Sequence, residues 1–243
     1  MLRRSIFISI ILALLTYLFF AVFIVSPKAE EEICHTMDIV VTDTLERHFI
    51  KKKDVELMIK KASLSPFGKK MKDIDTDQIE KTLLENKLIK KAECYKTTGG
   101  TLKVEVYQKM PIIRVIAGKN NYYLDLDGEI MPLASHFAAF VPVATGNIDE
   151  QYAKNDLYDF AKFIQSDPFW KAQIEQINIR TNKDVELTPR VGNHQILLGK
   201  MENYKENLEK LKLFYEKGLN EIGWNRYSFI NLKYENQVVC TKK

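Results

Sequence analysis

The residue types that carry most protein chemistry are present in this sequence of 243 residues, but they are not arranged as a catalytic or metal-binding set. No histidine stands at a metal-ligand spacing with another His or a Cys, apart from the adjacent pair Cys34 and His35. Neighbours in a strand point to opposite faces, so this pair is a poor chelate. The S-x-x-K, G-x-S-x-G and H-E-x-x-H motifs and a Gly-rich phosphate loop are also absent. The sequence therefore predicts no catalytic residues, no metal site and no cofactor.

Asp125 and Asp127 form a possible carboxylate pair, because alternate strand positions share a face and two carboxylates could bind a cation or divide acid and base roles. Their D-x-D-G context, completed by Gly128, is typical of a β-turn in which Asp caps the turn and Gly takes a positive φ. The turn is the favoured interpretation. Cys94 lacks a nearby helix start or an obvious base, so a buried thiol is favoured over a nucleophile.

The charge balance limits the kinds of partner. Lys and Arg number 36 and Asp and Glu number 32, which gives a net charge of +4. Arg3 and Arg4 in the N-terminal tail supply two of the excess positive charges, so the rest of the chain is nearly balanced. Such a balance argues against a nucleic-acid partner. With 46% hydrophobic residues, the chain has the composition of a folded protein.

The stretch Ile6–Val25 is apolar except for two hydroxyl residues and one tyrosine, and it predicts a transmembrane helix. Twenty helical residues rise about 30 Å, which is the thickness of the hydrocarbon core. Arg3 and Arg4 precede the stretch, and the acidic run Glu30–Glu32 follows it. The positive-inside rule then places the N-terminus in the cytoplasm and the bulk of the chain outside it. We expect a single-pass protein of the cytoplasmic (inner) membrane.

A cleavable signal peptide is the alternative to this anchor. The apolar run of a signal peptide is usually about 7–15 residues long and ends at an A-x-A-like site, which Ile6–Val25 fits poorly. Outside the cytoplasm disulfides can persist, so Cys34 and Cys94 could pair, with Cys240 left in the tail. Two buried thiols are the other possibility, and the sequence leaves both open.

The outer region divides at Met110-Pro111 into two parts with different patterns. After a linker, the first part predicts strand, helix, helix, strand, strand: 37–42, 52–62, 76–87, 89–96 and 101–107. The second part predicts a mostly antiparallel β domain with strands at 112–117, 122–126, 140–144, 174–180, 184–189, 195–198 and 228–234, and helices at 150–165 and 202–222. The fold class is therefore α+β.

The final predicted strand, Ser228–Tyr234, alternates cleanly between its two faces. A terminal strand is often an edge strand, whose unpaired N–H and C=O groups can accept a strand from a partner. The alternative is that this strand simply completes the sheet. The residues alone do not separate the two.

Five short motifs carry a resemblance to a known family. Lys87–Glu93 resembles the segment that enters the second strand of a POTRA domain, and Val104–Arg114 resembles the V-x-V-x-E-(R/K)-x-P-x-A junction. Tyr123–Gly128 is similar to an L-(L/I)-D-x-x-G turn, Val141–Gly146 to (L/V)-P-x-(L/I)-x-G, and Asn231–Tyr234 to a (V/I)-D-L-R-Y strand. Each motif is weak alone, but their order behind one anchor resembles the FtsQ/DivIB cell-division family.

This resemblance implies a non-enzymatic divisome scaffold that joins FtsB/DivIC-type and FtsL-type proteins at the division site and helps to control septal peptidoglycan synthesis. Together with the apolar run and the boundary at Met110-Pro111, it gives the following organisation: cytoplasmic tail 1–5, transmembrane helix 6–25, linker 26–36, POTRA-like domain 37–110, β domain 111–240 and tail 241–243. The alternatives are a POTRA-bearing envelope adaptor for protein assembly or export and, more distantly, an anchored cell-wall enzyme.

In the family, the terminal strand region engages the FtsB-type partner. Carried over to this chain, the partner-binding residues are Ser228, Phe229, Ile230, Asn231, Leu232, Lys233, Tyr234, Asn236 and Val238. Tyr234 is expected to supply buried area, and Lys233 a salt bridge to an acidic residue of the partner. Substituting either is expected to weaken binding while leaving thermal stability nearly unchanged.

Overall fold

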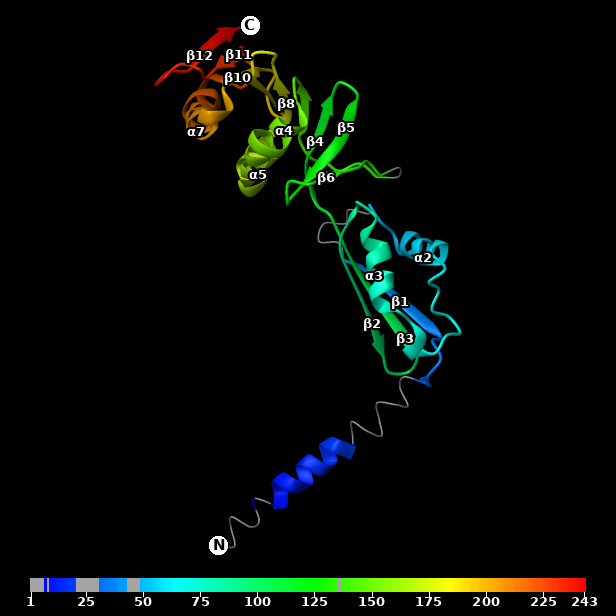
Figure 1. Ribbon diagram of the computed structural model, residues 1–243. Helices are drawn as coiled ribbons and strands as arrows, with labels where there is room; N and C mark the ends of the chain where they lie inside the picture. Colours follow the sequence, from blue (N-terminus) through cyan, green and yellow to red (C-terminus); the bar gives the residue numbers. More distant parts are fainter. Residues whose placement is uncertain (1–6, 8, 21–30, 43–48, 135–136) are drawn as a thin grey trace. The chain divides into compact units, whose positions relative to one another are not determined.

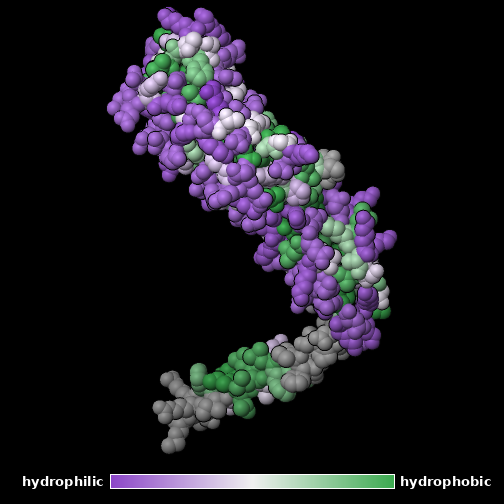
Figure 2. Space-filling model, turned by 45° about the horizontal axis from the view of Figure 1, so that its top comes forward, coloured by the Kyte–Doolittle hydropathy of each residue, from purple (hydrophilic) through white to green (hydrophobic). Residues whose placement is uncertain are grey.

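The computed structural model describes residues 7, 9–20, 31–42, 49–134 and 137–243 (Figure 1). Residues 7 and 9–20 are helical and exposed, and Figure 2 colours this segment almost wholly hydrophobic. Within the described ranges, no helix is both long and apolar enough to cross a bilayer. The predicted transmembrane helix 6–25 lies partly outside the described residues, and tail 1–5 and linker residues 26–30 lie wholly outside them. The chain divides into two compact units, residues 1–108 and 109–243.

The first unit has the predicted strand–helix–helix–strand–strand order. Its elements are β1 (Thr36–Thr42), α2 (Lys52–Lys61), α3 (Thr76–Leu84), β2 (Ile89–Thr97) and β3 (Thr101–Gln108), with a 3₁₀ turn at Met71–Asp73 before α3. The sheet order is β1-β3-β2, with β1 parallel and β2 antiparallel to β3. Helix α2 packs on β1 and α3 on β2.

The alternation in the sequence explains why β3 occupies the centre of this sheet. Leu102, Val104 and Val106 are fully buried, and the residues between them are half-buried. The start of α3 also follows the sequence, because the Asp75 carboxylate accepts the Gln78 N–H at 2.9 Å as a helix cap. These predictions are confirmed.

The segment 31–35 differs from the predicted linker because it is hydrogen bonded to the unit. One carboxylate oxygen of Glu32 accepts the N–H groups of Gly99 and Gly100, at 3.0 Å each, in the turn between β2 and β3. The Cys34 N–H donates to the Lys69 carbonyl at 2.8 Å. Both glycines have positive φ, so their N–H groups converge on one acceptor as in an anion-binding nest. Among the described residues, the hydrogen-bonded part of the first unit therefore begins at about residue 31.

The cysteines are free thiols. Cys34 and Cys94 are buried in the first unit, and Cys240 is half-buried in the second. Burial raises the pKa of the Cys94 thiol to about 12, which suits a packing residue and not a nucleophile. Of the two possibilities that the sequence left open for Cys34 and Cys94, the structure has two buried thiols and not the disulfide.

The second unit is built on one mixed sheet of nine strands. They are β4 (Pro111–Ala117), β5 (Asn120–Asp125), β6 (Ile130–Met131), β7 (Val143–Gly146), β8 (Ile174–Ile179), β9 (Val185–Pro189), β10 (Gln195–Gly199), β11 (Tyr227–Asn231) and β12 (Val239–Lys242). The order across the sheet is β12-β11-β10-β9-β8-β7-β4-β5-β6. Five neighbouring pairs are antiparallel and three are parallel, so the prediction of a mostly antiparallel domain is confirmed.

Two helical segments cover this sheet, and each contains a π-helical turn. The first segment comprises α4 (Glu150–Tyr152), a π turn (Ala153–Leu157) and α5 (Tyr158–Ser166), and it is followed by α6 (Pro168–Gln173). The second segment comprises α7 (Tyr204–Phe214), a π turn (Tyr215–Leu219) and α8 (Asn220–Ile222). Gly223 ends the second segment with φ +96°, as predicted. Helix α6 was not predicted, and the strand predicted at 140–144 begins only at Val143.

A buried histidine makes the stability of the second unit depend on pH. His194 is 3% exposed, and its Nε2 lies 2.8 Å from the Tyr215 hydroxyl. Burial lowers the pKa of His194 below its ordinary value. The unfolded chain then binds a proton at a higher pH than the folded chain, so stability falls as the pH drops below the unfolded pKa of about 6.5.

We expect the free energy of unfolding to fall from about pH 7 to about pH 5, by at most about 1.4 kcal/mol for each pH unit. His194→Gln should remove this part of the pH dependence. Urea unfolding followed by Trp fluorescence measures it, because both tryptophans, Trp170 and Trp224, lie in the second unit. If the free energy of unfolding changed equally with pH in the wild type and in His194→Gln, His194 would not be the cause of the pH dependence.

Candidate partner-binding surface

The last hairpin of the second unit shows which strand forms the edge of the sheet. Strand β11 is parallel to β10 on one side and antiparallel to β12 on the other. The possibility that Ser228–Tyr234 is an edge strand is therefore wrong. The strand ends at Asn231, whose side-chain oxygen accepts the Lys233 N–H at 3.0 Å and so starts a turn. The edge at this side of the sheet is β12, which pairs with β11 alone among the described strands.

The predicted partner-binding residues fall into three groups, according to burial and position. Ile230 and Leu232 are fully buried in the core of the unit, so they stabilise the fold and are not accessible to a partner. Three others are half-buried on β11: Ser228, Phe229 and Asn231. The remaining four lie in the connection 232–238, which we call the terminal connection: Lys233, Tyr234 and Asn236 are exposed, and Val238 is half-buried.

Lys233 already has a carboxylate partner within the chain. Its Nζ lies 2.8 Å from Oδ2 of Asp184, which is buried, and Lys200 approaches the other oxygen at 3.3 Å. The Lys233 ammonium is the main cause that holds the pKa of Asp184 below its ordinary value. A Cβ at Gly199 would lie 3.0 Å from Cγ of Lys233, so the lysine stem crosses closely over this glycine. The expectation that substituting Lys233 leaves stability nearly unchanged is inconsistent with this contact.

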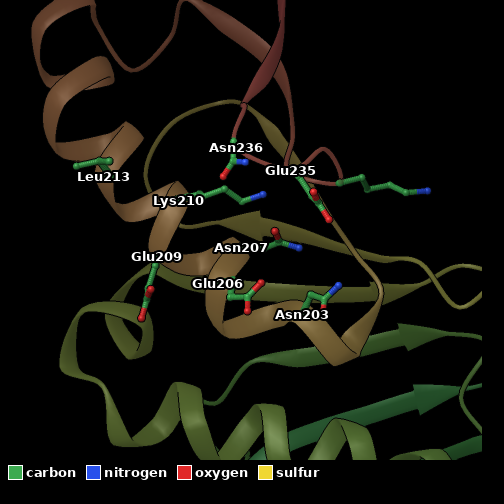
Figure 3. A pocket seen from close by; sticks show the side chains of 9 residues that line it. Asn203, Glu206, Asn207, Glu209, Lys210, Leu213, Glu235 and Asn236 are labelled. Carbon is green, nitrogen blue, oxygen red and sulfur yellow. The ribbon is translucent and has the colours of Figure 1, made fainter.

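The terminal connection is held against α7 by one lysine. Lys210 Nζ donates to the carbonyl oxygens of Leu232 and Tyr234, at 2.9 Å each. The Tyr234 side chain itself is 50% exposed. Figure 3 shows Lys210 extending from α7 toward the connection that carries Glu235 and Asn236. The backbone of the connection is thus fixed while its side chains stay accessible.

A groove lies between α7 and the terminal connection, and we call it the α7 groove. It consists of two hollows, of about 520 Å³ and about 470 Å³. The first hollow is lined by Asn203, Glu206, Asn207, Glu209, Lys210, Leu213, Lys233, Glu235 and Asn236 (Figure 3). The second is lined by Lys210, Leu213, Phe214, Lys217, Gly218, Asn236, Gln237 and Val238. The hollows share three residues and are therefore continuous.

Sequence analysis found only one wall of this groove. Lys233, Asn236 and Val238 were predicted as partner-binding residues, but the α7 wall was not. The helical stripe of α7 marks its buried side, through Leu208 and Leu211. Leu213, at 53% exposed, is an apolar residue outside that stripe. An apolar residue outside the buried stripe of a helix is a signal in the sequence that could have marked this wall.

Asp125 and Asp127, which the sequence offered as a possible carboxylate pair, lie in a turn, as the favoured interpretation predicted. Asp125 is buried, and its Oδ1 accepts the N–H groups of Asp127 and Glu129 at 2.9 Å each. Gly128 takes φ +81°, and Lys109 lies 3.1 Å from Oδ2 of Asp125. In the part of the chain that the structure describes, no group of three or more His, Cys, Asp or Glu side chains could hold a metal ion.

Comparison with known families agrees with the two structural units. A family model described as "FtsQ/DivIB, C-terminal related" matches residues 110–241, which is more than half of the chain. A second model, described as a POTRA-like domain, matches residues 32–107. No curated protein matches the chain in a sequence search. The two matches follow each other in the order of the two units.

Proposed function

Because the chain belongs to the FtsQ/DivIB family, we propose that it is a cell-division scaffold without enzyme activity of its own. Residues 6–25 anchor it in the cytoplasmic membrane with the N-terminus inside, and the two units act outside the cytoplasm at the division site. Its partners are FtsB/DivIC-type and FtsL-type proteins, through which it influences septal peptidoglycan synthesis. The charge asymmetry around residues 6–25 supports this topology.

The observation that carries the proposal is the edge at β12. Among the described strands, β12 pairs on one side only, so its other side offers N–H and C=O groups for an added strand. An extended partner segment that pairs there gains affinity from main-chain hydrogen bonds and selectivity from alternate side chains. The exposed part of the predicted site, in the terminal connection, lies directly before this strand.

Depletion of the protein in its own organism tests the function. Loss of a division scaffold should stop septation, so we expect filaments or chains of cells, seen by microscopy, while DNA replication continues. The alternative is a POTRA-bearing envelope adaptor, which the POTRA-like match also supports. Depletion of such an adaptor would instead reduce the amounts of assembled or exported envelope proteins. Cells that divide normally after depletion would exclude the scaffold.

A further inference from the structure

We propose that the α7 groove is a second contact surface for the same partner, and that it binds a segment carrying a basic residue beside an apolar one. This inference rests on the proposed function, because it concerns the partner that pairs at β12. It adds what that function does not specify: the chemistry of the partner segment beyond the added strand.

The apolar half of the groove has an exposed floor. Leu213 is 53% exposed, and Phe214 and Val238 are half-buried beside it. A Cβ at Gly218 would lie 2.9 Å from the Phe214 ring, so the absence of a side chain there lets the ring lie close against the π turn. The hollow above these residues, about 470 Å³, exceeds the volume of one aromatic side chain. An apolar side chain of a partner would gain buried area here.

The polar half of the groove carries free negative charge. Glu206, Glu209 and Glu235 line the hollow and are exposed, and the ion pairs found among the described residues do not include them. Lys233 is paired with the Asp184 carboxylate, whereas Lys210 donates to two neutral carbonyl oxygens and keeps its charge, so three carboxylates face one unpaired ammonium in this hollow. Three free carboxylates beside an apolar floor complement a basic side chain with an apolar neighbour.

The groove adjoins the edge at one end of β12. Val239 begins β12 and pairs with Asn231, the last residue of β11 before the terminal connection. Val238, the residue before it, already lines the groove. A partner strand that pairs along β12 and continues past Val239 therefore reaches the groove without crossing the sheet. One continuous partner segment can occupy both surfaces.

The test is a titration of the full-length chain in nanodiscs with the full-length FtsB/DivIC-type protein of the same organism, labelled with a fluorophore. Reversing two charges with Glu206→Lys and Glu209→Lys should weaken binding about tenfold or more at about 50 mM NaCl. The wild-type affinity should fall as NaCl rises to about 500 mM, and the double variant should lose this dependence. Leu213→Ser should weaken binding about tenfold at either salt concentration.

The matched control is the double variant Glu216→Lys and Glu221→Lys, which makes the same charge change at exposed positions that do not line the groove. It should keep the wild-type affinity. Unfolding followed by Trp fluorescence should show equal stability for all of these variants. Wild-type affinity in both groove variants would overturn the inference. Tighter binding after charge reversal would also overturn it, since the partner would then present an acidic residue.

A second pair of variants separates this inference from the proposed function. Consecutive N–H groups of a strand point to opposite edges. Proline has no N–H, so of the two variants Cys240→Pro and Thr241→Pro, one removes an N–H that faces β11 and the other removes an N–H that faces the open side of β12. That variant should weaken binding without changing the free energy of unfolding. If it does and the groove variants bind normally, only the groove inference fails. If the wild type does not bind this protein at all, both proposals fail.

Discussion

Lys233→Glu is expected to lower the free energy of unfolding of the second unit by about 3 kcal/mol. The substitution removes the ammonium 2.8 Å from the buried Asp184 carboxylate and puts a negative charge in its place. The Asp184 carboxylate is buried, whereas the Lys233 side chain is 41% exposed, so the loss comes from leaving a buried charge without its nearest cation. Lys200, at 3.3 Å, remains and keeps the loss at the lower end of the usual range.

Urea unfolding followed by Trp fluorescence measures this loss. Lys119→Glu, in the exposed turn between β4 and β5, makes the same charge change without a buried partner and should stay within about 0.5 kcal/mol of the wild type. Asp184→Asn should recover part of the loss in the Lys233→Glu background, because it removes the repulsion. A Lys233→Glu protein as stable as Lys119→Glu would show that the ion pair has no structural role.

Gly146→Ala is expected to destabilise the second unit by about 4 kcal/mol or more. Gly146 has φ +100°, a conformation that residues with a Cβ rarely adopt. A Cβ there would also lie 2.1 Å from the carbonyl oxygen of Ile179, the residue that pairs with Gly146 across β7 and β8. The new Cβ collides with a backbone oxygen, so no change of side-chain rotamer can relieve the clash. The strand pair itself must separate.

Gly223→Ala is the matched control for the steric part of this effect. Gly223 has nearly the same φ, +96°, but a Cβ there meets nothing within 4 Å. Gly223→Ala should therefore lower the free energy of unfolding only by the backbone strain, about 1–3 kcal/mol. Comparing the urea midpoints of the two variants isolates the clash. Equal losses in the two proteins would mean that the contact at Ile179 relaxes freely.

The sequence predicted most elements of both units because their patterns are local. The alternation of Leu102, Val104 and Val106 identifies β3, and Asp75 marks the start of α3. A residue such as Gly223 ends a helix through its own conformational freedom. These signals depend on neighbours in the chain, so they can be read without knowledge of the fold.

The edge of the large sheet could not be predicted in the same way. The alternating pattern continues through Lys233 and Tyr234, but the Asn231 side chain bonds the Lys233 N–H and stops the strand. Strand β12 has only four residues, too few for a periodic signal. Its place outside β11 depends on the order of the whole sheet, which no local pattern contains. The contact of Lys233 with Asp184 joins residues that lie 49 positions apart in the chain, so no local pattern contains it either.

The strand order also sets the stage of folding at which the proposed partner site appears. Strand β12 pairs only with β11 among the described strands, and β11 pairs on its other side with β10. Helix α7 lies between β10 and β11 in the chain. A parallel pair of this kind closes a long loop, so we expect it to form later than a hairpin does. The Asn207 side chain, which donates to the Leu198 carbonyl at 2.8 Å, ties α7 to β10 within that loop. An open edge beside a formed α7 groove is thus a property of the finished fold, and a partner that needs both would bind completed molecules and pass over partly folded ones.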